Sequence, residues 1–210
     1  MGFLRISDER YARDNGSYGL TTLLREHAVC RSREIRLHFP AKSGKAATRT
    51  LVDEQAYPVV WALLRRKDPG PRLFAYWERR AWRGVHAEEL NAYLSERGGQ
   101  DVTAKDFRTG YATVLAAVAL AFSEGTADAS RARRGRVVAR AVREVGGYLG
   151  NTPALCRASD IDRRVIDLYE DGRTIAPVLG KLGEEAMFGE PATHGAVERA
   201  VLNLLRAGHV

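Results

Sequence analysis

The sequence predicts an α+β protein that is mainly α-helical, with a small three-stranded antiparallel sheet and a helical lobe. Two observations predict this fold class. Before residue 53, short segments alternate apolar and polar residues, as half-buried strands do. After residue 53, apolar residues recur with the helical period. We therefore expect one domain over 1–210, with a small β lobe over 1–52 and a helical lobe over 53–210.

The β lobe is expected to begin with a short helix and to continue as three strands. Ser7 is a good N-cap for the helix, and Asn15-Gly16 is a typical stop signal. The strands are expected around 18–28, over 34–40 and over 47–52.

The second and third strands carry the clearest strand signal. Ile35, Leu37 and Phe39 alternate with polar residues, as expected for a strand with one buried face. The segment from Ala41 to Ala46 separates the two strands, and Gly44 within it is a turn former. These features predict a hairpin with an exposed, lysine-rich tip.

The helical lobe is expected to contain helices over about 53–67, 86–98, 103–123, 130–149, 153–159, 162–171 and 192–207. The segment 68–71 is the clear turn-rich break, and 172–191 shows no informative pattern. The helix over 130–149 has two opposite stripes. One stripe is apolar (Val138, Val142, Val145, Leu149), and the other is basic (Arg133, Arg136, Arg140, Arg143).

The composition indicates a basic globular protein. The chain has 210 residues, a net charge of +7 and 45% hydrophobic residues, which excludes a disordered tail. No apolar run approaches the roughly 20 residues that span a bilayer. The two cysteines, Cys30 and Cys156, cannot form a disulfide scaffold or a cysteine-rich zinc site. We expect a soluble, cytoplasmic protein with a polyanionic partner.

Individual polar residues say little about function. Lys42 is compatible with a solvated lysine, Arg108 with a structural ion pair and Asn151 with a helix cap. No metal-ligand spacing, P-loop or nucleophile elbow is present in the sequence. We therefore expect no metal and no cofactor.

Taken in order, however, a set of motifs resembles the type IB DNA topoisomerases, particularly the short bacterial and poxvirus-like branch. The motifs are Phe3-Leu-Arg-Ile6, Asn15-Gly-Ser-Tyr-Gly-Leu-Thr-Thr-Leu-Leu24, Phe39-Pro-Ala-Lys-Ser-Gly-Lys45, Ala104-Lys-Asp-Phe-Arg-Thr109, Ala112-Thr-Val-Leu-Ala116, Tyr148-Leu-Gly-Asn-Thr-Pro153 and Cys156-Arg-Ala-Ser159. The resemblance implies the catalytic fold that these enzymes share with the tyrosine recombinases. It also implies double-stranded DNA as the partner, supercoil relaxation as the activity, and a monomer associated with the nucleoid.

The resemblance also implies the chemistry. In the family, a tyrosine attacks a phosphodiester, forms a 3′-phosphotyrosine and releases a 5′-hydroxyl, which later attacks back. No metal or nucleotide takes part, so protein groups must stabilise the charge on the phosphorane and supply a proton to the leaving oxygen. By position, Arg5 and Arg108 match the two family arginines, Lys42 the general acid, and Asn151 a donor to a nonbridging oxygen.

Further residues match or flank positions beside the DNA. Tyr11 and Lys105 match family positions next to the cleavage site, and Lys45 lies on the same hairpin tip as Lys42. Arg136 and Arg140 belong to the basic stripe and could follow the DNA backbone, although no motif assigns them.

The nucleophile position departs from the family pattern. Asp160 follows Arg157-Ala-Ser159, where relatives have tyrosine nine residues after the histidine or asparagine. An aspartate is shorter than tyrosine, is anionic unless Arg5 or Arg108 neutralises it, and would form a labile acyl phosphate. Tyr148 and Tyr169 are the other tyrosines near this motif. We expect strand cleavage to be lost or severely reduced.

Two other departures accompany it. Gly110-Tyr111 replaces the usual Trp-His, and a glycine within a helix costs about 1 kcal/mol relative to alanine. The family's N-terminal β-rich domain, which forms half of a clamp around DNA, is expected ahead of Phe3 but is not in this sequence. Three alternatives stay open: a non-enzymatic duplex-binding module, a tyrosine recombinase and a nuclease that depends on Asp160.

Overall fold

The computed structural model describes residues 4–44, 46–99, 101–123, 130–185 and 195–208. The chain divides into two compact units, and the division falls between Lys105 and Asp106. We call the first the β unit (4–105) and the second the helical unit (from 106 onward). The division lies further along the chain than residue 53, because two helices after the sheet belong to the β unit.

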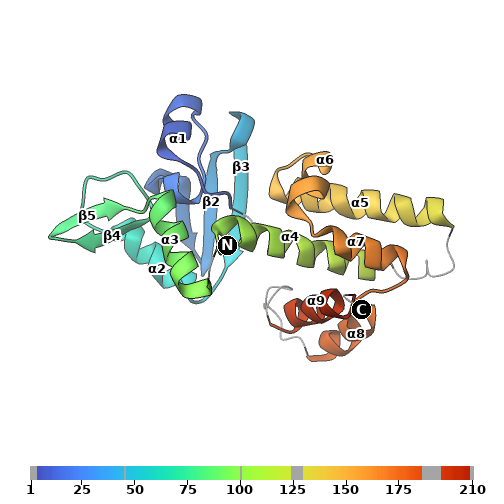
Figure 1. Cartoon of the computed structure of the whole chain (residues 1–210). Coiled ribbons are helices and arrows are strands. Elements are labelled where there is room, and N and C mark those ends of the chain that lie inside the picture. The colour runs from blue at the N-terminus through green and yellow to red at the C-terminus, as the bar shows by residue number, and fades with distance from the viewer. Residues whose placement is uncertain (1–3, 45, 100, 124–129, 186–194, 209–210) are drawn as a thin grey trace. The chain divides into compact units, whose positions relative to one another are not determined.

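The β unit contains a three-stranded antiparallel sheet in the order β1-β2-β3, as the sequence predicts (Figure 1). Its strands and helices are α1 (Glu9–Asn15), β1 (Ala28–Arg31), β2 (Glu34–Pro40), β3 (Ala46–Val52), α2 (Ala56–Arg65), β4 (Ala75–Glu78), β5 (Ala81–Gly84) and α3 (Ala87–Gly98). Short 3-10 turns complete it: η1 (Leu20–Thr22), η2 (Arg25–His27) and η3 (Lys42–Gly44).

One face of the sheet forms the core of this unit. Ile35, Leu37 and Phe39 of β2 are buried, whereas the residues between them are exposed. Ile35 is paired with Leu51 of β3, which is also buried, and α2 packs against β1 and β2 through the buried Val60. The predicted alternation and the hairpin between β2 and β3 are confirmed.

The strand predicted around 18–28 is wrong. Residues 20–27 form the turns η1 and η2, and β1 begins only at Ala28. The hydroxyl of Thr22 accepts a hydrogen bond from the Gly19 N–H (2.9 Å), and that of Thr21 donates to the Ser7 carbonyl (2.6 Å). Thr22 thus binds the backbone of its own turn and Thr21 binds the backbone before α1, and these bonds take the place of a strand ladder.

A second sheet lies within the segment where the sequence predicts only helices. β4 and β5 form a two-stranded antiparallel hairpin in which Trp77 is directly opposite Trp82. Figure 1 shows this hairpin projecting from the β unit, between α2 and α3 in the chain.

The helical unit holds most of α4 (Ala104–Ala121), together with α5 (Arg131–Leu149), α6 (Pro153–Leu155), the π-helix η4 (Cys156–Asp160), α7 (Arg163–Glu170), α8 (Ala176–Glu185) and α9 (Ala196–Ala207). Its core contains Leu120 of α4, Val138 of α5 and Val165 of α7, which are at most 2% exposed. The apolar stripe of α5 is buried and its arginine stripe is exposed, as predicted.

Most of the predicted helices of this unit are confirmed, with three differences. The helix expected over 153–159 is split into α6 and η4. Helix α8 lies in the segment without an informative pattern, and α9 begins at Ala196, while 192–194 fall outside the described residues. No helix in the described part of the chain is long and apolar enough to cross a membrane.

Candidate functional site

Arg108 is a buried residue of α4, with only 5% of its surface exposed. Its Nη2 atom donates a hydrogen bond to the carbonyl oxygen of Leu149 (2.9 Å), the last residue of α5. Carbonyls in the last turn of a helix lack helical partners and carry partial negative charge, so they suit a guanidinium. The end of α5 therefore holds Arg108 in place.

The sequence after Leu149 turns the chain sharply towards η4. Gly150 ends α5 in the left-handed conformation (φ 71°), and Pro153 is the first residue of α6. The N–H of Asn151 donates to the carbonyl of Gly146 (2.8 Å), and a Cβ at Gly146 would lie 3.2 Å from the Asn151 oxygen. The small residue at 146 thus lets the loop lie against α5 and fixes the backbone of Asn151.

Asp160 is buried beside these two residues, with 7% of its surface exposed. The Nδ2 atom of Asn151 donates a hydrogen bond to Oδ2 of Asp160, nine residues further along the chain. The Nε atom of Arg108 lies 3.6 Å from Oδ1 of the same carboxylate. The structure therefore brings together three of the five residues that the resemblance marks as catalytic.

Arg108 and Asn151 contact an anionic group, and that group is the carboxylate of Asp160 in the same chain. An arginine and a side-chain amide converge on one carboxylate, which is the donor set that phosphate oxygens also favour. The carboxylate of Asp160 therefore accepts a hydrogen bond from Asn151 and lies within ion-pair distance of Arg108, two residues that the resemblance assigns to a DNA phosphate.

Cys156, at the start of η4, is fully buried. Burial and the negative charge of Asp160 raise the pKa of its thiol to about 11, although Arg108 lowers it in part. Since the thiolate is the nucleophilic form of cysteine, Cys156 is not a candidate nucleophile near neutral pH.

The two tyrosines near the motif have different surroundings. Tyr169 of α7 is 4% exposed and lies in the core of the helical unit. Tyr148 of α5 is 44% exposed, and its hydroxyl lies 3.1 Å from that of Tyr111. Burial and the hydrogen bond with Tyr148 raise the pKa of Tyr111. Tyr148 therefore lies beside Tyr111, and Tyr169 is enclosed in the core.

Arg5 belongs to the β unit, where its backbone is held by the segment after α1. Its carbonyl accepts a hydrogen bond from the Leu20 N–H (2.7 Å). A Cβ at Gly19 would overlap the Arg5 carbonyl and approach Ser7 Cβ to 2.8 Å, so glycine is required there. The first two motifs of the resemblance therefore pack directly against each other.

Lys42 is exposed on the turn η3, between β2 and β3. Gly44 gives this turn its left-handed residue (φ 70°), and the hydroxyl of Ser17 donates to the Ala41 carbonyl (3.0 Å). The predicted tip is therefore confirmed, with Lys42 on it. Lys45 lies outside the described residues.

The other predicted DNA-binding residues lie on helices. The backbone of Tyr11 is part of α1, but its side chain lies outside the described residues. Lys105, Arg136 and Arg140 have exposed side chains. Arg140 also forms an ion pair with Glu144 one turn away (2.8 Å), and this pair raises the pKa of Arg140.

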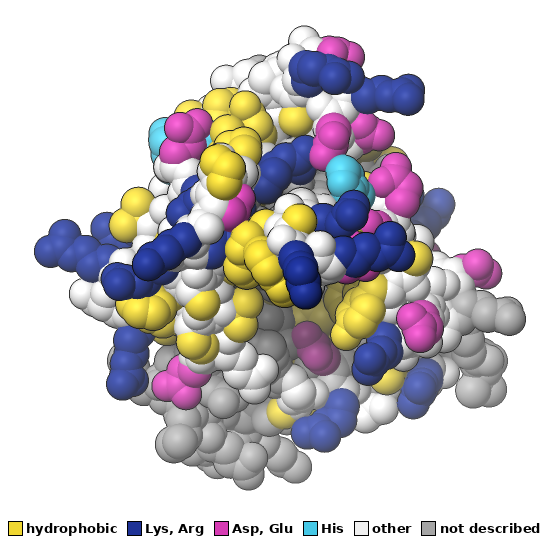
Figure 2. All heavy atoms as spheres, turned by 90° about the vertical axis from the view of Figure 1, so that its left-hand side faces the viewer, with side chains coloured by type: hydrophobic (Ala, Val, Ile, Leu, Met, Phe, Trp, Pro, Cys, Tyr) yellow, Lys and Arg dark blue, Asp and Glu magenta, His cyan; other side chains and the backbone are white. Residues whose placement is uncertain are grey.

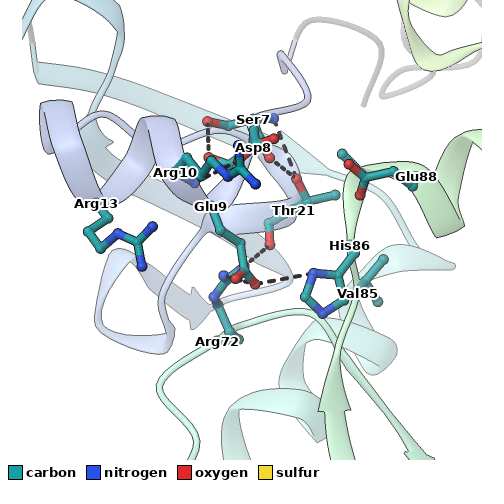
Figure 3. Close-up of a pocket in the computed structure, with 11 residues that line it drawn as sticks. Ser7, Asp8, Glu9, Arg10, Arg13, Thr21, Arg72, Val85, His86 and Glu88 are labelled. Carbon is teal, nitrogen blue, oxygen red and sulfur yellow. Dashed lines mark hydrogen bonds and ion pairs between the residues drawn. The ribbon is translucent and has the colours of Figure 1, made fainter.

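A pocket of about 480 Å³ lies beside α1 in the β unit (Figure 3). The carboxylate of Glu9 contacts the guanidinium of Arg72 and lies 3.2 Å from Nδ1 of His86. Arg72 also donates to the carbonyl of Thr21 (2.6 Å). Glu9, Arg72 and His86 are thus paired at the pocket and connect α1 to the start of α3. No sequence motif marks this pocket.

Comparison with known proteins covers most of the chain. Residues 2–172 match the family model described as eukaryotic DNA topoisomerase I, catalytic core. Over 176 residues the chain is 29% identical to the DNA topoisomerase 1B of Acanthamoeba polyphaga mimivirus. That alignment covers 80% of this chain and 51% of the viral protein, so the chain spans about half the length of this relative.

Proposed function

The chain belongs to the family of the eukaryotic DNA topoisomerase I catalytic core, and from this premise we propose a type IB topoisomerase domain that binds duplex DNA without cleaving it. Support for DNA as the partner comes from the family and from the exposed cations Lys42, Lys105 and Arg136. Support for the loss of cleavage comes from the surroundings of Asp160.

A single observation carries the proposal: Asp160 is buried against Arg108 and Asn151. A nucleophile must reach the phosphorus while these donors hold the nonbridging oxygens. Here the side chain at position 160 binds the donors itself. An incoming phosphate would therefore compete with a carboxylate that is already hydrogen-bonded and charge-paired.

Asp160 is also a poor nucleophile on chemical grounds. Its carboxylate ends much nearer to the backbone than a phenol oxygen, and its negative charge opposes the approach of a phosphodiester. If it attacked, the bond formed would be an acyl phosphate, with the 5′-oxygen as leaving group. Water hydrolyses an acyl phosphate readily, so the product would be a nick that is not rejoined.

The other residues of the site keep the chemistry of the family. Arg5 and Arg108 would each donate paired hydrogen bonds to nonbridging phosphoryl oxygens. Lys42 would protonate the leaving 5′-oxygen, and its place on an exposed turn suits a group that acts only once DNA is bound. Asn151 would donate through its amide, which needs no protonation.

The decisive experiment is plasmid relaxation without metal, comparing the unmodified chain with Asp160→Tyr and with Asp160→Phe as the matched control. We expect no relaxation by the unmodified chain, relaxation with a covalent 3′ adduct by the tyrosine variant, and none by the phenylalanine variant. Phenylalanine removes the same charge as tyrosine but provides no hydroxyl.

Two results would contradict the proposal. Robust relaxation by the unmodified chain, with a covalent adduct, would show that cleavage is intact. Nicking without rejoining that disappears in Asp160→Ala would instead identify a nuclease.

Binding without cleavage has a test of its own. Contacts between cations and phosphates release counterions, so affinity for a duplex should fall steeply with salt, by about 0.9 logarithmic units per contact and decade of salt. Fluorescence anisotropy with a labelled duplex at several salt concentrations measures this slope. Weak binding that salt does not change would argue against a DNA-binding role.

A further inference from the structure

The β4–β5 hairpin carries features that the site described above does not use. Trp77 is 59% exposed, and its ring forms an edge-to-face pair with that of Trp82 on the opposite strand (centroids 5.5 Å apart). Two adjoining aromatic rings form a contiguous surface, and contiguous apolar surfaces, unlike single exposed side chains, mark binding sites. The hairpin therefore presents an aromatic surface that nothing in the described part of the β unit covers.

Arg79 and Arg80 form the tip of this hairpin. Both have positive φ values, 48° and 63°, as in a type I′ turn. Such turns favour Asn-Gly, so two arginines here occupy a backbone conformation that L side chains rarely adopt. This departure from turn chemistry places two cations side by side at the end of the hairpin.

These two cations are available to a partner. Within the described residues, neither Arg79 nor Arg80 has a side-chain hydrogen bond or ion pair, and both are exposed. Arg83 on β5 is different, because it forms an ion pair with Glu78 (3.0 Å). Figure 2, which views the side where the hairpin projects in Figure 1, shows hydrophobic side chains bordered by lysines and arginines.

The base of the hairpin is firmly held. The guanidinium of Arg66 lies over the Trp82 ring (5.5 Å to its centroid) and donates to the carbonyl of Leu73 (2.7 Å). On the other face, the hydroxyl of Tyr76 donates to Glu89 of α3 (3.1 Å). An element anchored on both faces loses little conformational entropy when it binds.

We infer that the β4–β5 hairpin is an auxiliary DNA-binding element, in which Trp77 stacks on an unpaired base while Arg79 and Arg80 contact the adjoining phosphates. This inference rests on the proposed function for the choice of a nucleic acid as partner. Stacking on an aromatic ring needs an open base face, which single strands and gaps offer and continuous duplex does not. An acidic protein segment would match the charge but would leave the Trp77 ring without a flat partner.

The first test removes the cations without weakening the turn. Arg79→Asn/Arg80→Gly introduces the preferred type I′ sequence, so the variant should be at least as stable as the unmodified chain. We expect the slope of log affinity against log salt for a single-stranded oligonucleotide to fall by about 1.4, as expected for two lost contacts. The melting temperature shows whether the variant is folded.

The control is a second turn of this kind within the described residues of the β unit. Ser32 and Arg33 also have positive φ values, 50° and 64°, but their turn joins β1 to β2, two strands without a tryptophan, and its one cation is already paired with Glu54 (3.9 Å). Ser32→Asn/Arg33→Gly should leave the salt slope unchanged. Equal losses in both variants would overturn the inference, because they would indicate non-specific attraction.

The second test concerns the ring of Trp77. Trp77→Leu should weaken binding to a gapped or single-stranded oligonucleotide on the order of tenfold. Its affinity for an uninterrupted duplex should change little, whereas Trp77→Phe should retain most of the affinity for the gap. Quenching of tryptophan fluorescence by the oligonucleotide should be smaller in both variants.

The outcomes separate this inference from the proposed function. If the chain binds DNA and the hairpin variants bind single strands and duplex as the unmodified chain does, only the hairpin inference fails. If no DNA binds at any salt concentration, the proposed function fails first. Quenching by poly-glutamate equal to that by the oligonucleotide would also overturn base stacking, since it would identify an acidic protein segment as an adequate partner.

Discussion

Two buried arginines, one in each unit, differ in role: one holds a loop together and the other faces an anion. Arg66 in the β unit and Arg108 in the helical unit are 7% and 5% exposed, and each lies beside an aspartate. Arg66 donates to Asp68 and to the carbonyls of Leu63, Gly70, Arg72 and Leu73. Arg108 donates to Leu149 and faces Asp160.

The two arginines differ in the groups that they contact. Arg66 is surrounded by the backbone of the loop that it organises, and no ligand could replace all of these carbonyls. Arg108 faces a side-chain carboxylate, whose place a phosphate oxygen could take. A buried arginine that donates mostly to backbone carbonyls of the surrounding loop therefore indicates a structural role. A buried arginine that faces an exchangeable anion indicates a binding role.

The largest effect is expected from Arg66→Met. Removing the guanidinium leaves buried carbonyls, including that of Leu73, without their donor, so we expect a loss of about 4 kcal/mol in the free energy of unfolding. Urea denaturation followed by tryptophan fluorescence measures it, because Arg66 lies against Trp82. Adding Asp68→Leu should not restore stability, since the carbonyls remain unsatisfied. Restoration by the double variant would break the comparison.

A smaller loss of stability, which a second substitution should largely restore, is expected at Asp160. Asp160→Leu leaves Arg108 buried without its counter-charge, which should cost about 3 kcal/mol. Arg108→Met should also destabilise, whereas the double variant should recover most of the loss because two apolar groups then face each other. Urea denaturation of the four proteins completes the double-mutant cycle. Additive losses would mean that the two residues do not interact as the geometry indicates.

Much of the fold could be predicted because each confirmed element has one buried and one exposed face. The strand β2 and the helix α5 are examples, with periods of two and 3.6 residues. The β4–β5 hairpin could not be predicted in this way, because Trp77 faces solvent and Arg79-Arg80 replaces the usual turn residues. The strand expected around 18–28 does not form, because the hydroxyls of Thr21 and Thr22 bind backbone groups of Ser7 and Gly19.

The candidate site was predictable only in part. The resemblance marks Arg108, Asn151 and Asp160, and the structure brings them together. The hydrogen bond between Asn151 and Asp160 depends on the π-helix η4, and hydrophobic periodicity contains no signal for a π-helix. The possibility that an arginine neutralises Asp160 follows from charge alone, but which arginine does so depends on the packing of α4 against the end of α5.

The smallest effect is expected from Cys156 at alkaline pH, and it reports on the charge of Asp160. Folding raises the pKa of this thiol from 9.0 to about 11, so its contribution to stability is complete below pH 9. As the pH rises to about 11, the unfolded chain ionises first and roughly 2 kcal/mol is lost. Urea denaturation across this range should show the loss, and Cys156→Ala should show less of it. In Asp160→Asn the loss should be smaller, because the carboxylate charge that raises the pKa of the folded Cys156 thiol is gone and the folded and unfolded pKa values lie closer together. An identical pH profile in that variant would mean that the side chain of Asp160 does not influence the Cys156 thiol.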